Sequence, residues 1–403
     1  MWEQIRSNQF RSVLLVVGMG MLLLSLGYFF GLYFFASGAV GIVLAVIVWV
    51  ILNLVAYFQG DSILLSVAGA RKISPEDHPR LYNVVEEMKI ASGLEKVPDV
   101  YIIDDPALNA FAVGRDPKRA AVAITSGLLE KLNRDELQGV IGHEIGHIKN
   151  RDVLFMAICS VMLGTIVMLA WYFSRFFLWG GVAPRSRRSS SSGGSGAIQL
   201  IILAVGIILM ILAPIMAQLI YFAVSRRKEY LADASSALYT RYPEGLASAL
   251  EKLAASTQPV KSANQATAPM YIVNPLARRG LSAEDWTSTH PPISERIRIL
   301  RSMAGGASFA EYERAYEQVH KGGRMLPVSA VAASAPIALR TAKPEELLPE
   351  PDKLERRRQT SDLLWRLNDY KIINCDCGTR LKVPPAFKES SVKCPHCGRV
   401  HPL

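Results

Sequence analysis

Four long apolar segments divide this chain of 403 residues. They run from about Ser12 to Phe35, Gly38 to Phe58, Val153 to Phe173 and Ile198 to Val224. Each is close to the ~20 apolar residues that a helix needs to cross the hydrocarbon core of a bilayer. Helices buried in soluble proteins rarely stay uncharged over such a length. The pattern therefore predicts an α-helical membrane protein with four transmembrane helices, arranged as two hairpins.

Composition and charge agree with a membrane protein. Half of the residues are apolar, and the net charge is +10. Such a charge also suits nucleic-acid binding, but much of the excess flanks the apolar segments, where positive charge sets membrane orientation. The flanking residues are Arg6, Arg11, Lys149, Arg151, Arg226, Arg227 and Lys228. They predict a multi-pass protein of the cell (inner) membrane with both termini cytoplasmic, although Arg185, Arg187 and Arg188 blur the bias.

The apolar segments divide the chain into six parts. Residues 1–60 and 153–224 form the hairpins, and residues 61–152 and 225–322 form two soluble parts on one membrane face, because a hairpin returns to the side it left. Residues 323–370 are a Pro- and Ala-rich linker with a possible helix over Asp352–Tyr370, and 371–403 form a cysteine module. The Ser- and Gly-rich stretch Pro184–Gly196 predicts a flexible loop.

Local patterns predict a mainly helical soluble domain with a small β-sheet. Val100–Asp105 and Ala120–Thr125 resemble strands on either side of Asn109–Gly114. Asn133 and Glu136 have the spacing of a capping box, which marks a helix start. That helix is expected to continue through Ile148, almost to the third apolar segment.

The predicted helix carries His143-Glu144-Ile145-Gly146-His147, an H-E-x-x-H motif. Residues four apart share a helix face, so both imidazoles can reach one zinc ion. Glu144 then lies where it can act as general base toward a water molecule. A polar helix face with two unrelated histidines is the alternative.

A catalytic zinc usually has three protein ligands, and Glu229 is the candidate for the third. It follows the fourth apolar segment, just as His147 precedes the third, so the hairpin returns it to the same membrane face. Asp233, one helical turn further on, can accept a hydrogen bond from a ligand histidine. The alternative for Glu229 and Asp233 is a solvated charged helix face.

The chain resembles the HtpX-type membrane zinc metalloproteases, relatives of the CAAX prenyl endopeptidases. The resemblance covers about Met1 to Met303 and rests on Asn109–Ala112, His143–His147, Ser225–Asp233, and Thr289–Pro292 with Arg296. It implies a zincin-type catalytic domain, zinc ligation by His143, His147 and Glu229, Glu144 as general base and Asp233 behind the ligands.

The resemblance also implies that Asn109–Ala112 is an edge strand that pairs with an extended substrate. His290 either lies near the site or belongs to a rigid turn before the helix Ile293–Leu300. Arg296 is expected to be a structural ion-pair partner.

Four of the five cysteines form a separate motif near the C-terminus: Cys375, Cys377, Cys394 and Cys397. Their spacing approximates a zinc ribbon, in which four thiolates close a structural site. Two disulfides are the alternative and would require an oxidising compartment. Cys159, inside the third apolar segment, reads as an ordinary apolar side chain. The module is expected to recognise a protein partner more readily than nucleic acid, or only to cap the tail.

These patterns together predict a membrane-embedded zinc endopeptidase. It would hydrolyse peptide bonds of membrane or misfolded proteins at the cytoplasmic face in protein quality control, with one catalytic and one structural zinc ion. The alternatives are a CAAX-type prenyl-protein processing protease and a non-catalytic scaffold that recruits partners through the ribbon. The intact set His143, Glu144, His147 and Glu229 disfavours the scaffold, and four spans favour the HtpX-like function.

Overall fold

The computed structural model describes residues 2–179, 195–256, 258–261, 271–273, 290–326, 331–332, 337–340 and 350–403. Thr289 and almost all of the predicted loop Pro184–Gly196, with its three arginines, lie outside these residues.

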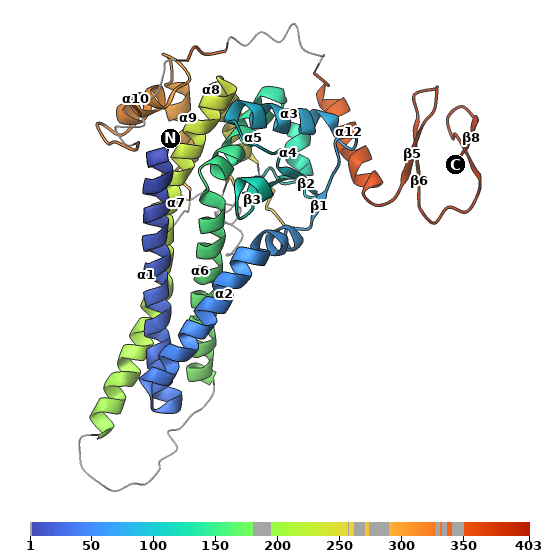
Figure 1. Cartoon of the computed structure of the whole chain (residues 1–403). Helices are drawn as coiled ribbons and strands as arrows, with labels where there is room; N and C mark the ends of the chain where they lie inside the picture. The colour runs from blue at the N-terminus through green and yellow to red at the C-terminus, as the bar shows by residue number, and fades with distance from the viewer. Residues whose placement is uncertain are drawn as a thin grey trace.

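Every predicted apolar segment is helical. The four long helices are α1 (Trp2–Phe35), α2 (Gly38–Val67), α6 (Asp152–Trp179) and α7 (Ser195–Thr240). They run side by side below a body of shorter elements (Figure 1). Within the described part of the chain, two stretches are long and apolar enough to cross a membrane, Gly38–Val67 and Asp152–Trp171, and Val16–Leu32 is a shorter apolar helix. Four spans therefore remain a prediction.

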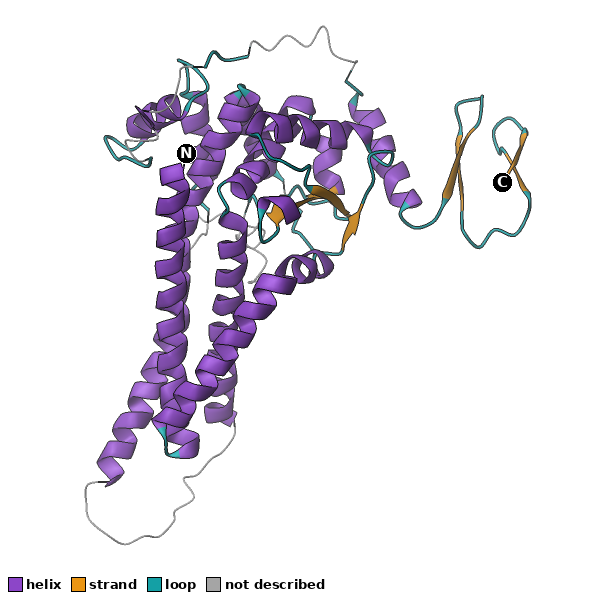
Figure 2. Cartoon of the chain, viewed as in Figure 1, coloured by secondary structure: helices purple, strands orange, loops and turns teal. Residues whose placement is uncertain are grey.

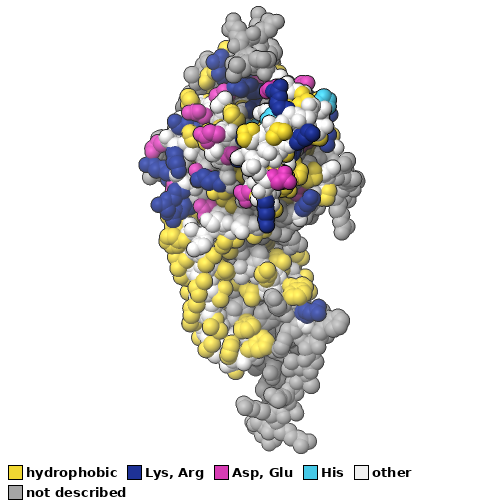
Figure 3. Space-filling view, turned by 90° about the vertical axis from the view of Figure 1, so that its right-hand side faces the viewer, with side chains coloured by type: hydrophobic (Ala, Val, Ile, Leu, Met, Phe, Trp, Pro, Cys, Tyr) yellow, Lys and Arg dark blue, Asp and Glu magenta, His cyan; other side chains and the backbone are white. Residues whose placement is uncertain are grey.

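Hydrophobic and charged side chains separate along the length of the molecule. Large apolar side chains of α2 are exposed, among them Ile47, Ile51 and Phe58. On the face shown in Figure 3, hydrophobic side chains predominate among the described residues of the lower half, whereas most Lys, Arg, Asp and Glu side chains lie on the upper half. This division is typical of a protein whose helices contact lipid below a solvated body.

The body contains a four-stranded sheet in the order β1-β2-β4-β3. Its strands are β1 (Ala70–Lys72), β2 (Asp99–Ile103), β3 (Ala110–Val113) and β4 (Ala121–Thr125). β2 and β4 are parallel, with Val100 opposite Val122, and the other pairs are antiparallel. The predicted strands are confirmed to within one or two residues, and β3 lies at an edge.

Helices and one short 3-10 helix make up the rest of the body. They are α3 (Pro79–Ser92), the short η1 (Pro117–Arg119), α4 (Ser126–Lys131), α5 (Arg134–Lys149), α8 (Pro243–Ala255), α9 (Ile293–Arg301) and α10 (Phe309–Val319). α5 begins at the predicted capping box, because the side chains of Asn133 and Glu136 exchange hydrogen bonds with each other's backbone. It is buried from Glu136 to Ile148 and packs against α3, α7 and α8. Arg151, at a φ of 58°, separates it from α6.

The C-terminal part begins with α12 (Lys353–Arg366) and ends in two hairpins. The first pairs β5 (Lys371–Asn374) with β6 (Arg380–Val383), and the second pairs β7 (Ser391–Lys393) with β8 (Val400–Pro402). The hairpins extend sideways from the body (Figure 2). α12 itself packs on α4, and its Leu363 is fully buried in the main core. The helix expected over Asp352–Tyr370 is thus confirmed from Lys353 to Arg366, with Asp352 as its N-cap, and it ends four residues earlier than predicted.

Candidate metal centre and catalytic site

Two glycines allow α5 and α7 to approach closely. A Cβ atom at Gly146 would lie 3.0 Å from the Cβ of Ser235, and one at Gly142 would lie 3.2 Å from the Oγ of Ser236. Because glycine has no side chain, α5 can pack closer to α7 at these two positions than a helix with larger residues there could. This contact brings the imidazoles of α5 next to Glu229 on α7.

His143, His147 and Glu229 direct three donor atoms at one point. The Nε2 atoms of the two histidines are 3.2 Å apart. The Glu229 carboxylate oxygens lie 3.5 Å from His143 Nε2 and 3.4 Å from His147 Nε2. Ligands about 2.0–2.2 Å from a tetrahedral zinc ion are separated by roughly 3.3–3.6 Å. The three buried residues therefore fit a zinc ion.

Asp233 and Arg296 fix the first histidine from behind. Asp233 Oδ1 lies 2.9 Å from His143 Nδ1. Arg296 is fully buried and binds both Asp233 oxygens, at 2.7 and 2.8 Å. The bidentate ion pair holds the carboxylate in place, and the carboxylate orients the imidazole. Arg296 is thus the ion-pair partner that the sequence indicated.

A second carboxylate, missed by sequence reasoning, lies behind the other histidine. Asp152 Oδ2 is 3.6 Å from His147 Nδ1, and Asp152 Oδ1 is 3.4 Å from Lys228 Nζ. Both Asp152 and Lys228 are buried. The available signal was an acidic residue directly before an apolar segment, five positions after the motif. Lys228 was counted only as part of a basic cluster that sets topology.

Glu144 is buried beside the donor atoms. Its Oε1 atom has no hydrogen-bond partner among the residues that the structure describes. Burial raises the pKa of the Glu144 carboxyl above its ordinary value, and the neighbouring imidazoles only partly oppose this. A carboxyl group with a raised pKa is well suited to take up a proton and release it again.

Electrostatics at the centre favour a positive charge. Burial lowers the pKa of His147, but the carboxylates of Asp152 and Glu229 outweigh it and raise that pKa to about 10. Burial acts oppositely on Glu229, yet His290 and the ligand imidazoles hold the pKa of its carboxyl well below the usual range. A site that stabilises cationic imidazoles between ionised carboxylates also stabilises a divalent cation.

His290 contacts the site itself. Its Nδ1 atom lies 3.1 Å from Glu229 Oε2, and the side chain is buried. The two residues that follow it, Pro291 and Pro292, lead directly into α9. His290 therefore lies near the site, as one interpretation expected, and it also directly precedes the turn before α9, as the other expected.

The edge strand β3 is partly covered near the site. The backbone N–H of Ile272 donates to Ala110 O at 3.1 Å, and Asn109 Nδ2 donates to Val273 O at 3.0 Å. Arg296 Nη1 also donates to Ile272 O. The segment Tyr271–Val273 thus pairs with the first part of β3 and is tied to the Arg296 that supports the site.

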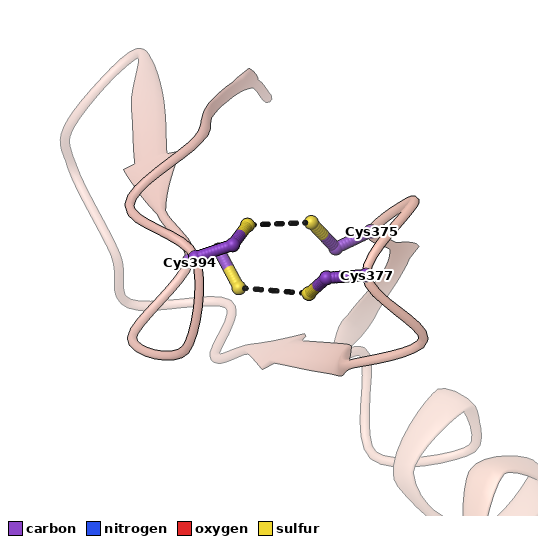
Figure 4. A group of neighbouring side chains, drawn as sticks. Cys375, Cys377 and Cys394 are labelled. Atoms are coloured by element: carbon purple, nitrogen blue, oxygen red, sulfur yellow. Dashed lines mark hydrogen bonds between the residues drawn. The ribbon is translucent and has the colours of Figure 1, made fainter.

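The four C-terminal cysteines form a second cluster, held between the two hairpins (Figure 4). Cys375 Sγ lies 3.4 Å from Cys397 Sγ, Cys377 Sγ lies 3.7 Å from Cys394 Sγ, and all four thiols are free. Four thiolates about 2.3 Å from a zinc ion are roughly 3.8 Å apart. Hydrogen bonding with Thr379 lowers the pKa of Cys377 to about 5, whereas the neighbouring thiols raise the pKa of Cys375 to about 12. The cluster fits a four-thiolate metal site.

Comparison with known proteins identifies the family. The sequence profile of peptidase family M48 matches residues 75–304, more than half of the chain. The chain belongs to peptidase family M48. It is therefore a metalloprotease, and the matched residues include the H-E-x-x-H helix, Glu229 and Arg296.

Several M48 relatives are similar over nearly their whole length. The protease HtpX homolog of Dictyoglomus turgidum is 46% identical over 302 residues, 75% of this chain and 94% of the relative. The homolog of Thermoanaerobacter pseudethanolicus is 43% identical over 75% of this chain and 98% of the relative. The homolog of Streptococcus pneumoniae is 41% identical over 75% of this chain and 100% of the relative. The resemblance to HtpX-type proteases is confirmed.

Among solved structures, the crystal structure of S. mikatae Ste24p matches with a TM-score of 0.41 and 20% identity. It covers 74% of this chain and 67% of that one. The cysteine module lies outside the residues that the M48 profile matches.

Proposed function

We propose that this M48 protease is a zinc endopeptidase in which His143, His147 and Glu229 bind the catalytic metal and Glu144 is the general base. The observation that carries the proposal is the convergence of three buried donor atoms at the separations of a tetrahedral zinc site. The neighbouring Glu144, with its raised pKa, supplies the proton-transfer group.

The residues of the site have separate tasks in peptide hydrolysis. When bound, zinc supplies Lewis-acid polarisation of the scissile carbonyl. Glu144 accepts the proton of the attacking water and then delivers it to the leaving amine. Asp233, fixed by Arg296, accepts the Nδ1 proton of His143 and so keeps Nε2 of that ring directed at the metal. An extended substrate adds to β3 beyond the part covered by Tyr271–Val273.

The position of the site supports substrates that emerge from the membrane. α5, which carries both histidines, is separated from α6 only by Asn150 and Arg151, and Glu229 belongs to α7. If α1, α2, α6 and α7 all span the bilayer, both hairpins return to the body side. The site then lies close to the membrane surface, where unfolded or membrane-anchored chains are within reach. We therefore propose hydrolysis of membrane or misfolded proteins in quality control.

The cytoplasmic face is the proposed location of the body, with soluble parts over residues 61–152 and 225–322. Lys149, Arg151, Arg226 and Arg227 all lie where the long helices meet the body, and positive charge favours the cytoplasmic side. A cytoplasmic body also places the cysteine module in a reducing compartment, which suits a second zinc ion and a docking role toward protein partners. Disulfides found at these cysteines under thiol-trapping conditions would contradict this orientation.

Glu144→Gln tests the catalytic assignment. The amide cannot accept the proton, so cleavage of an unfolded protein substrate should fall by at least 100-fold, within the range that general bases contribute. Zinc bound at the catalytic site should remain, since Glu144 is not a ligand. Glu229→Ala is the matched variant, expected to lose both activity and that zinc. Near-wild-type cleavage by Glu144→Gln would overturn the mechanism.

Cells carrying wild type or Glu144→Gln allow the substrates to be identified. Proteomic comparison should show membrane proteins or damaged proteins accumulating with the variant. If no protein changes in abundance or in its termini, the proposed quality-control role is wrong while the peptidase assignment still stands on the purified enzyme.

A further inference from the structure

The two ligand histidines have matching surroundings on the sides that face away from the metal. Behind His143 lie Asp233 and a buried arginine, Arg296. Behind His147 lie Asp152 and a buried lysine, Lys228. We propose that Asp152 is the positioning residue for His147 and that Lys228 fixes Asp152, so that each ligand imidazole has its own carboxylate and cation. The inference rests on the proposed zinc ligation.

The polar atoms between His147 and Asp152 are complementary. His147 Nδ1 and Asp152 Oδ2 are both buried, and neither has a hydrogen-bond partner among the described residues. They face each other at 3.6 Å. An imidazole that binds metal through Nε2 carries its proton on Nδ1, which needs an acceptor. A shift of about 0.5 Å, well within side-chain mobility, closes this gap to a normal hydrogen bond.

Lys228 supplies the charge that a buried carboxylate requires. Its Nζ atom lies 3.4 Å from Asp152 Oδ1 and 5.5 Å from the centre of the Phe155 ring. An ionised carboxylate taken out of water is costly unless a cation pairs with it. Lys228 directly precedes Glu229, and consecutive helix residues point about 100° apart. Two consecutive residues of α7 thus serve the same site: Glu229 as a metal ligand, and Lys228 as the cation that pairs with the carboxylate behind His147.

The two supports differ in where they come from. Asp233 and Arg296 belong to α7 and α9, deep in the body, whereas Asp152 is the first residue of α6. Lys228 lies on α7 shortly after its apolar segment. The orientation of His147 therefore depends on how α6 and α7 pack against each other where they leave the body. The ring of His143 has no such dependence.

Zinc affinity of the full-length protein tests the role of Asp152. Asp152→Asn keeps the shape but replaces the acceptor charge, so competition with a chelator should show zinc binding weakened by about 10–100-fold, as for other residues that orient metal ligands. Asp233→Asn should behave similarly. Asp99→Asn, which removes an exposed carboxylate paired with Lys72, is the control and should match wild type. Cobalt in the four-thiolate site contributes equally in every variant, so it is subtracted. The remaining cobalt spectrum of Asp152→Asn should also be altered, because the His147 ring turns.

Lys228 is tested through its dependence on Asp152. Lys228→Met should weaken zinc binding, whereas Lys228→Arg, which keeps the positive charge, should bind zinc like wild type. The double variant Asp152→Asn, Lys228→Met should bind zinc no more weakly than Asp152→Asn alone, because the lysine acts through the carboxylate. Additive losses, or an Asp152→Asn protein with the zinc affinity and cobalt spectrum of the Asp99→Asn control, would overturn the inference. Zinc retained by Glu229→Ala would instead overturn the ligand set.

Discussion

The surroundings of the buried histidines in the body shift their pKa values in opposite directions. His143 and His147 face carboxylates, which raise the pKa of both imidazoles against the effect of burial. His78 is also buried, and burial together with the positive charge of Arg80 lowers the pKa of His78 to about 4. Its Nδ1 atom accepts a hydrogen bond from Leu81 N–H at 3.1 Å and caps α3. That cap requires the neutral ring.

The His78 cap should make stability fall in mild acid. The folded-state pKa of about 4 lies below the usual 6.5, so the contribution is complete above pH 6.5 and is lost as the pH falls toward 4. At pH 5 the loss amounts to about 2 kcal/mol. His78→Asn keeps a capping side chain that does not titrate. Between pH 7.5 and 5, unfolding experiments should show wild type losing more stability than His78→Asn, and equal losses would contradict the assignment.

At the scale of elements, the contact of α5 with α7 and α8 determines whether the site forms. Ser236 Oγ donates to Gly139 O at 2.7 Å across the α5–α7 contact. A Cβ atom at Gly139 would lie 2.6 Å from the backbone nitrogen of Leu246 in α8. One at Gly142 would first meet the hydroxyl of Ser236, at 3.2 Å. A backbone atom cannot move aside without shifting α8, whereas a serine side chain can rotate.

Gly139→Ala and Gly142→Ala should therefore differ although the substitution is the same. Both gain about 1 kcal/mol of helix propensity. In Gly139→Ala, the overpacking cost of about 1–3 kcal/mol should exceed this gain and lower the stability. Gly142→Ala should lose less stability, because its methyl group meets the Ser236 hydroxyl, which can turn away at the cost of its hydrogen bond to Gly139 O. Chemical unfolding of the purified proteins measures the difference, and equal stabilities would show that α8 yields to the added methyl group.

At the scale of the whole molecule, the boundary between body and tail lies after α12. Leu363 is buried in the body, Arg366 Nη2 donates to Asp77 O at 2.8 Å, and Arg71 Nη1 donates to Leu367 O at 2.8 Å. Ion pairs of Arg380 and Lys382 join the first hairpin to α12. Parts of the preceding segment are packed as well, since Met325 and Leu326 are buried.

Two truncations should separate the metal sites. The full chain should hold about two zinc ions, one in the three-ligand site and one in the four-thiolate site. A chain ending at Tyr370 should lose one ion and still cleave an unfolded substrate. A chain ending at Pro351 also lacks α12, so it should be less stable because the core partners of Leu363 become exposed. Metal analysis and melting curves test these expectations. Loss of all activity in the chain ending at Tyr370 would place the hairpins within the catalytic fold.

Much of this architecture could be predicted because its signals are local. Long apolar stretches gave the long helices, and the spacing of Asn133 and Glu136 gave the start of α5. The spacing of His143 and His147 places both rings on one helix face. These features depend on residues within a few helical turns of each other, so the sequence displays them directly. The strands were located to within one or two residues for the same reason.

The sequence indicated Asp233 behind one ligand histidine, but only the tertiary structure showed which groups lie behind His147. Asp152 looked like a charge at a helix start, and Lys228 looked like a topology signal, until α6 and α7 were seen to bring them together behind His147. Likewise, the pairing of Ile272 with Ala110 and the docking of Leu363 join residues more than 100 positions apart. Such contacts follow from how whole elements pack, and no short stretch of sequence specifies that packing by itself. The sequence determined the donor types and their helix, and the fold determined their electrostatic surroundings.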